Sequence, residues 1–75
     1  MQFDYQGKHY ATVRASDLKR DGMGLELERG GHTAAEVFYS DASGDFSMSL
    51  FEESLPLAVV ERLIVEARVV LLPIK

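Results

Sequence analysis

Cysteine is absent from the 75-residue chain, and histidine occurs only twice. Without cysteine there is no disulfide framework, no thiol nucleophile and no thiolate metal site. Apolar residues never run for the roughly 18 positions that a membrane-spanning helix requires. The first ten residues also lack the basic and then apolar order of a signal peptide. The sequence therefore predicts a soluble, cytoplasmic protein, folded as one domain over residues 1–75 around a small core.

The chain also has no excess of basic residues, and its formal net charge is -4 at pH 7. Residues 1–32 carry five basic and five acidic groups, whereas residues 33–75 carry three basic and seven acidic groups. Nucleic-acid affinity rests largely on the neutralisation of phosphates by Lys and Arg. The charge balance therefore disfavours a nucleic-acid partner and, for the second half of the chain, opposes one.

One long helix is predicted over residues 54–72, and the rest of the chain is organised around it. Ser54 can cap its first turn, and Pro56 suits that turn because its missing N–H has no helical partner there. Pro73 ends it. At about 100° per residue, one broad apolar stripe forms and is expected to pack on a sheet. The stripe comprises Leu57, Val60, Leu63, Ile64, Ala67, Val70 and Leu71, with Val59 at its margin.

A second apolar strip lies on the other side of this helix, between two charged strips. It consists of Ala58, Val65, Val69 and Leu72. A helix that is apolar on two sides is usually covered on two sides. Either the sheet curls around the helix or the segment after Val69 is not helical, or the strip contacts another chain. On the last interpretation these four residues form a candidate interface, with another protein or with a second copy in a homodimer.

Alternation of apolar and polar residues predicts strands in the first fifty residues. Residues 1–6 and 8–15 form a hairpin whose two-residue turn is either Gln6-Gly7 or Gly7-Lys8. Both turns put the same three aromatic side chains on one face. These are Phe3, Tyr5 and Tyr10.

Three further strands are predicted at residues 23–29, 34–40 and 45–51. A two-residue turn at Gly30-Gly31 would set Leu25 opposite Glu36, which mixes core with charge. A three-residue loop, or a five-residue loop of the same parity, sets Leu25 opposite Val37 instead, and we expect that register. A four-residue loop at residues 41–44 then pairs Tyr39 with Phe46, Val37 with Met48 and Ala35 with Leu50.

These strands and the helix give an α+β fold: an antiparallel β-meander of four to five strands, with one C-terminal α-helix packed across one face. The expected core joins three strands to the helix. Its members are Leu25, Leu27, Val37, Phe46, Met48, Leu50, Val60, Leu63, Ile64 and Ala67. The opposite sheet face is polar except for Phe38 and Phe51, and this exposed aromatic pair is the second candidate interface.

The sequence contains no convincing motif for a metal-binding or cofactor-binding site. Oxygen-bearing side chains between Asp41 and Glu52 have the spacing of an EF-hand loop. Phe46 occupies the position that needs glycine, however, and the same residues alternate as a strand. Gly30-Gly31 lacks the lysine of a phosphate-binding loop. We therefore expect no metal, no cofactor and no catalytic residue.

The most favoured function is a small, non-catalytic interaction module that binds a protein partner or itself. One alternative is a weak binder of single-stranded nucleic acid, in which basic residues such as Lys8 and Arg14 work with the aromatic face. A second alternative is a small enzyme that uses His9 or His32, which would require a pocket that joins one of them to a carboxylate.

Overall fold

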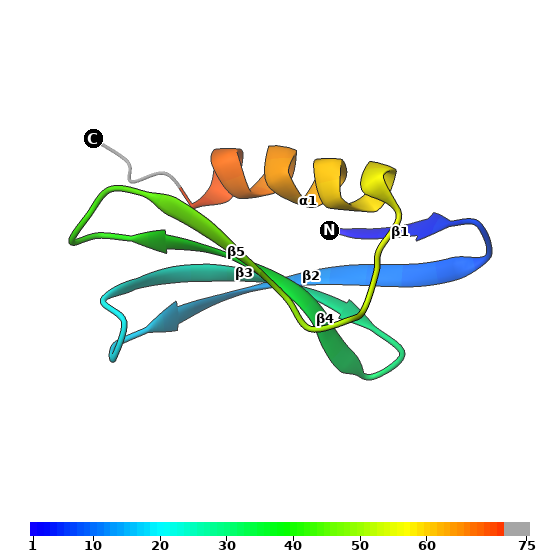
Figure 1. Cartoon of the computed structure of the whole chain (residues 1–75), viewed down its shortest axis with the longest axis horizontal. Coiled ribbons are helices and arrows are strands. Elements are labelled where there is room, and N and C mark those ends of the chain that lie inside the picture. Colours follow the sequence, from blue (N-terminus) through cyan, green and yellow to red (C-terminus); the bar gives the residue numbers. More distant parts are fainter. Residues whose placement is uncertain (72–75) are drawn as a thin grey trace.

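The structure is a computed structural model, and it describes residues 1–71. Its elements are β1 (Gln2–Tyr5), β2 (Lys8–Asp17), β3 (Gly22–Arg29), β4 (His32–Ser40), β5 (Phe46–Leu50) and α1 (Leu57–Val70). Each strand pairs antiparallel with the next, so the five-stranded sheet has the order β1-β2-β3-β4-β5. The predicted α+β meander with a C-terminal helix on one face is confirmed (Figure 1).

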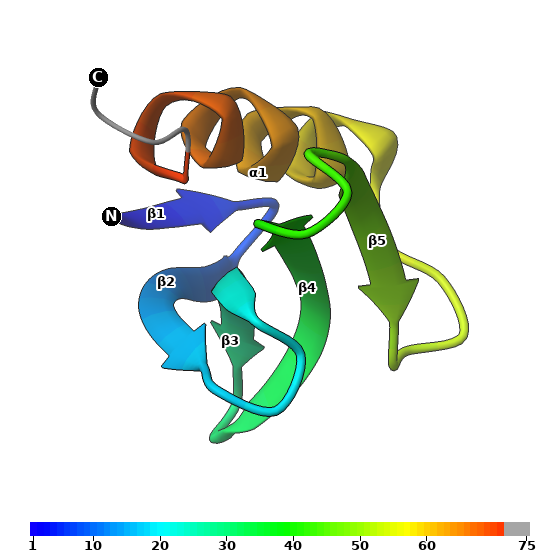
Figure 2. The same cartoon turned by 90° about the vertical axis from the view of Figure 1, so that its left-hand side faces the viewer.

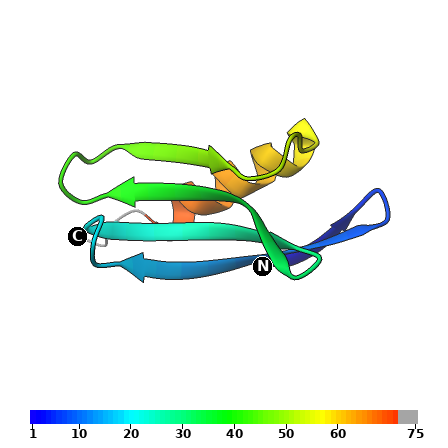
Figure 3. The same ribbon diagram turned by 60° about the horizontal axis from the view of Figure 1, so that its bottom comes forward.

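The sheet is curled, and α1 lies over its concave side. In the end-on view the strands pass from β1 around to β5, and the helix covers the opening between these two strands (Figure 2). From the convex side, β2 to β5 lie in front of the helix, and the β1–β2 hairpin projects at one end (Figure 3). The hydrophobic core therefore occupies the trough between the sheet and α1. Within residues 1–71, no helix is long and apolar enough to cross a membrane.

The first hairpin uses the turn at Gln6-Gly7, one of the two predicted placements. Gln6 and Gly7 both have positive φ, 50° and 78°, which suits the right-handed twist of a two-residue hairpin. Phe3 lies opposite Tyr10, and their rings stack with centroids 5.4 Å apart. Both rings are buried beneath α1 with Tyr5 packed beside them, so the aromatic face is the core face.

The β3–β4 hairpin has the predicted register but not the predicted loop. The turn is the two-residue Gly30-Gly31, with φ values of 59° and 82°. Leu27 nevertheless lies opposite Ala35 as predicted, because a β-bulge places Ala34 as an extra residue in β4. Beyond the bulge, the residues of β4 are shifted by one position relative to β3. A three-residue loop would have produced the same shift and therefore the same pairs. The β4–β5 register also follows the prediction: Tyr39 with Phe46, Val37 with Met48 and Ala35 with Leu50.

The helix begins at Leu57, three residues later than predicted. Pro56 is the N-cap residue and makes no side-chain capping hydrogen bond, so the predicted Ser54 cap is wrong. The reason is the extended backbone of Pro56, with ψ 136°, which keeps Ser54 outside the helix. At the other end Leu71 is the C-cap, and its N–H donates to the Ala67 carbonyl at 2.9 Å. The predicted last residue, Leu72, lies outside the described residues.

The buried face of α1 is rotated from the predicted stripe towards the β1 side. Val59, placed at the margin, is 1 % exposed, whereas Leu57 is 71 % exposed. The cause is the aromatic pair of the first hairpin, Phe3 and Tyr10, which supplies core on that side of the trough. The buried residues of the helix and its C-cap are Val59, Leu63, Ala67 and Leu71.

The core therefore overlaps the predicted one only in part. Leu25, Leu27, Val37, Leu63 and Ala67 are buried, as predicted. Phe46 and Met48 are partly buried against the core, and Val60 and Ile64 are half-buried. Leu50 was predicted wrongly, because it is 54 % exposed at the end of an edge strand. Buried hydrophobic residues that the predicted core omitted are Phe3, Tyr10, Ala34, Ala35, Phe38, Val59 and Leu71.

Candidate interaction surfaces

The outward strip of α1, as we name Ala58, Val65 and Val69, faces away from the sheet. The three residues follow one another at seven and then four positions, so they align along one side of the helix. Val65 is 65 % exposed, Val69 is 75 % exposed, and Ala58 is exposed as well. The curled sheet therefore does not cover the strip: all three of its described members are exposed. Its fourth member, Leu72, lies outside the described residues.

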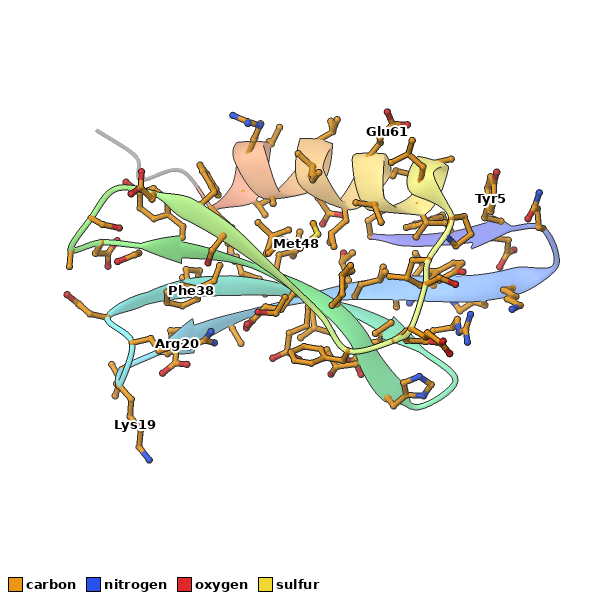
Figure 4. All side chains as sticks on the ribbon, viewed as in Figure 1. Tyr5, Lys19, Arg20, Phe38, Met48 and Glu61 are labelled. Carbon is orange, nitrogen blue, oxygen red and sulfur yellow. The ribbon has the colours of Figure 1, made fainter. Side chains whose placement is uncertain are left out.

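Charged and polar contacts on the β1 side fix which side of α1 faces outward. Arg62 places its guanidinium carbon 4.4 Å from the centroid of the Phe3 ring. The carboxylate of Glu66 has the Thr12 hydroxyl within hydrogen-bonding distance of both of its oxygens, at 2.8 Å and 3.1 Å. These contacts tie one flank of the helix to β1 and β2. Glu61 points away from the sheet (Figure 4).

On the convex face of the sheet, Phe38 is not the exposed aromatic that alternation predicts. Its side chain is buried, at 7 % exposure, because Arg20 of the β2–β3 loop folds over it. The guanidinium carbon lies 4.1 Å from the ring centroid (Figure 4). Phe51, in contrast, is exposed. The predicted exposed pair is therefore reduced to Phe51 alone.

The Arg20 cluster is internally satisfied, which favours a structural role. The Arg20 guanidinium donates one hydrogen bond to each carboxylate oxygen of Glu36, both at 3.0 Å, and another to Asp17. The hydrogen bonds to Glu36 and then to Asp17 raise the pKa of Arg20 above its usual value, and Arg20 lowers the pKa of Asp17. A Cβ at Gly24 would lie 2.5 Å from a Glu36 oxygen, so glycine leaves the room that this buried carboxylate occupies.

Each histidine contacts a carboxylate, but on the exposed surface. His9 Nδ1 lies 2.7 Å from Asp4 Oδ1 in the first hairpin, and His32 Nε2 lies 3.0 Å from Glu52 Oε1. The other oxygen of Glu52 accepts a hydrogen bond from Arg29. The side chains of His9 and His32 are 59 % and 56 % exposed. Among residues 1–71, no three His, Cys, Asp or Glu side chains are grouped so that they could hold a metal ion.

The mixture of basic and aromatic residues that suggested nucleic acid does not gather on one surface. Phe3 and Tyr10 are buried in the core, where they cannot stack on a base. Arg20 and Arg29 are paired with carboxylates, and Arg14 donates to the Val70 carbonyl at 3.4 Å.

The outer edge of β5 is a surface that the sequence analysis missed. Strand β5 is the last of the sheet order, so its far side meets no other strand of residues 1–71. At its two ends, the Ser40 N–H donates to the Asp45 carbonyl, and the Phe51 N–H donates to the Ala34 carbonyl. Because antiparallel pairing alternates, residues 45, 47, 49 and 51 bond to β4. The backbone groups of Phe46, Met48 and Leu50 therefore point outward from the edge.

Beside this edge lies a small apolar groove between β5 and α1, with a volume of about 210 Å³. Its lining residues are Val37, Phe46, Ser47, Met48, Ile64, Ala67 and Arg68. Met48 lies between the sheet and the helix (Figure 4). The signal that could have revealed the edge is the composition of β5, FSMSL, which contains none of the charges or prolines that usually protect an edge strand.

Comparison with known proteins found no matching family model, curated protein or solved structure.

Proposed function

We propose that this protein is a small, non-catalytic interaction module that binds another protein through the outward strip of α1. The observation that carries the proposal is the exposure of Val65 and Val69 on a helix whose opposite side is buried. Large contiguous apolar patches commonly mark a contact surface, and Val65 and Val69 lie about one turn apart on the exposed side of α1. A cytoplasmic location, expected from the sequence, is part of the same proposal.

The spacing of the strip supports recognition of a helix by a hydrophobic groove. In that mode an amphipathic helix inserts side chains at i, i+4 and i+7 into the groove of its partner. Val65 and Val69 are four residues apart, and Ala58 precedes Val65 by seven. Because α1 is already packed on its own sheet, binding would not need to order it, which lowers the entropic cost of association.

The size of the strip favours a concave partner over a second copy of the same strip. Full burial of a fully exposed valine contributes roughly 1.5–3 kcal/mol. Val65 and Val69 are 65 % and 75 % exposed, so their remaining burial contributes about 2–4 kcal/mol before the cost of association. Two convex helices in contact would bury these residues only partly, whereas specific interfaces usually bury more than about 1,000 Å². A groove can also reach the flanking Glu61 and Arg62, which then form a polar rim.

The two alternatives from the sequence gain less support. A nucleic-acid surface would need free basic groups beside exposed rings, yet Arg20 and Arg29 are paired and Phe3 is buried. An enzyme would need one histidine–carboxylate pair in a water-excluding pocket, and both observed pairs lie on the exposed surface.

Site-specific photo-crosslinking in the cells that produce the protein tests the proposal. A photoreactive residue at position 65 should give a discrete adduct with another protein, and the further substitution Val69→Glu should remove it. The matched control carries the photoreactive residue at Lys19, which is exposed at the tip of the β2–β3 loop (Figure 4). Equal adducts from positions 65 and 19, or an adduct that Val69→Glu leaves unchanged, would contradict the proposed role of the strip.

A further inference from the structure

We propose that β5 pairs antiparallel with β5 of a second copy of this chain, so that two five-stranded sheets join into one continuous sheet. The two-fold axis passes beside Met48. The inference shares with the proposed function the view that the protein is an interaction module. It concerns a different surface, however: the edge of β5 and not the outward strip of α1. The occupant of the β5 edge is thus another copy of the same strand.

The backbone of β5 offers the required hydrogen-bonding groups. The N–H and C=O groups of Phe46, Met48 and Leu50 point away from β4. With Met48 on the axis, it faces the partner's Met48, while Phe46 and Leu50 face each other across the interface. Each of these three pairs can exchange two backbone hydrogen bonds. The register uses the whole length of the strand, from Phe46 to Leu50.

The sequence of β5 is complementary to itself in this orientation. Phe46-Ser47-Met48-Ser49-Leu50 has the same apolar and polar pattern in both directions. The axis therefore sets apolar residues opposite apolar residues on the α1 side, and Ser47 opposite the partner's Ser49 on the convex side. No charge is brought against a like charge, which would oppose pairing. A one-residue shift would set serine opposite Met48 and opposite either Phe46 or Leu50, so the proposed register is the favoured one.

Apolar side chains beside the edge are left partly uncovered by residues 1–71. Leu50 is 54 % exposed, and the apolar groove that Met48 and Ile64 help to line beside β5 is open to solvent. Apolar side chains from a second β5 would lie against this opening and bury part of it.

The other edge strand of the sheet, β1, is protected against pairing with another strand, whereas β5 is not. Strand β1 has only four residues and carries the charged Asp4. Short length and charge are the usual devices that prevent edge pairing. Strand β5 has five residues, no charge and no proline. Pairing through β5 alone gives a closed dimer, because each copy then offers one edge and uses it.

Two double variants with charges on the exposed serines test the pairing and its register. Ser47→Lys with Ser49→Lys sets lysine opposite lysine twice across the axis, whereas Ser47→Glu with Ser49→Lys sets glutamate opposite lysine twice. Both serine side chains are exposed on the convex face, so the core is untouched. By sedimentation equilibrium the parent should be a dimer, the two-lysine variant should dimerise at least about tenfold more weakly, and the glutamate–lysine variant should keep the dimer.

Three outcomes of that experiment would overturn the inference. If the parent protein stays monomeric up to about millimolar concentration, β5 does not pair with a second copy. The β5 edge would then be available to an extended segment of another protein. Equal dimerisation of the two charge variants moves the interface away from β5. A dimer abolished by Val65→Lys with Val69→Glu moves it to the outward strip of α1. Circular dichroism and urea denaturation of every variant keep loss of folding apart from loss of pairing.

A disulfide test reads the same register independently, because the chain has no cysteine of its own. Ser47 and the partner's Ser49 would form a non-hydrogen-bonded pair, with Cα atoms about 4.5 Å apart, a distance that a disulfide can bridge. Protein with Ser47→Cys mixed with protein with Ser49→Cys should form a mixed disulfide dimer. Either protein alone should form far less. Equal yields from the mixture and from the separate proteins would refute the register.

Failure of this inference and failure of the proposed function give different results. A monomeric parent protein would remove β5 pairing and leave the crosslink from position 65 as it was. Loss of that crosslink with an intact dimer would remove the role of Val65 and Val69 in partner binding and leave β5 pairing standing.

Discussion

Replacing Leu63 with alanine should destabilise the fold by about 2–5 kcal/mol, the range for removing a fully buried leucine side chain. Leu63 is 0 % exposed and packs in the trough between α1 and the sheet. At roughly 0.05–0.15 kcal/mol per residue, a chain of 75 residues has a total stability of about 4–11 kcal/mol. The substitution therefore removes a large part of the free energy of unfolding.

The same helix offers a matched control in Leu57→Ala. Leu57 is 71 % exposed, and the two substitutions change helix propensity alike. Urea denaturation followed by circular dichroism should show a much lower midpoint for Leu63→Ala, and Leu57→Ala should stay within about 1 kcal/mol of the parent. In thermal unfolding each kcal/mol corresponds to about 4–8 °C for a domain of this size. Equal shifts for the two variants would refute the burial of this face of α1.

Four further results are expected. Tyr10→Phe should leave stability unchanged or raise it by about 1 kcal/mol in urea denaturation, because the buried Tyr10 hydroxyl has no hydrogen-bond partner among the described residues; a loss above 1 kcal/mol would contradict this. Gly24→Ala should lower stability by about 1–3 kcal/mol, because its Cβ displaces Glu36 from Arg20, and a neutral result would show that the carboxylate moves freely. Hydrogen bonds from Arg20 lower the pKa of Asp17 in the fold, so its contribution is present above the ordinary Asp pKa and is lost as pH falls through the folded value; Asp17→Asn should therefore destabilise at pH 7 and progressively less as the pH falls, and a difference that does not shrink on acidification would refute the linkage. Duplex DNA should not bind at physiological salt, given the net charge of -4, and a micromolar complex in a titration would be the contrary result.

Alternation and parity were sufficient to predict the sheet because burial fixes register. The pairs Leu25 with Val37 and Val37 with Met48 were predicted by keeping apolar residues opposite each other. The same argument chose the wrong loop at Gly30-Gly31, since a bulge at Ala34 changes parity without any change in hydrophobicity. Matching apolar residues across two strands identifies which residues pair. It does not show whether the extra residue lies in the loop or in a bulge within a strand.

Surface predictions were less successful because side chains from other elements decide exposure. Phe38 alternates with the polar face, but Arg20 reaches across from a loop and buries it. Leu50 alternates with the core face, but it stands at an edge that α1 leaves exposed. The rotation of α1 towards Phe3 likewise depends on the neighbouring hairpin, which the helical sequence does not contain. The outward position of Val65 and Val69 was predictable because it depends on helical spacing alone.

The order of the elements has a consequence for synthesis on the ribosome. Every strand pairs with the strand made just before it, so the sheet can form progressively as the chain emerges. The helix that covers the trough is made after all five strands. At a synthesis rate of about 5–20 residues per second, the twenty residues from Phe51 to Val70 take roughly one to four seconds. During that interval Leu25, Leu27 and Val37 have no cover, so the nascent sheet passes through a period in which a chaperone, or another nascent copy, can bind where α1 later packs.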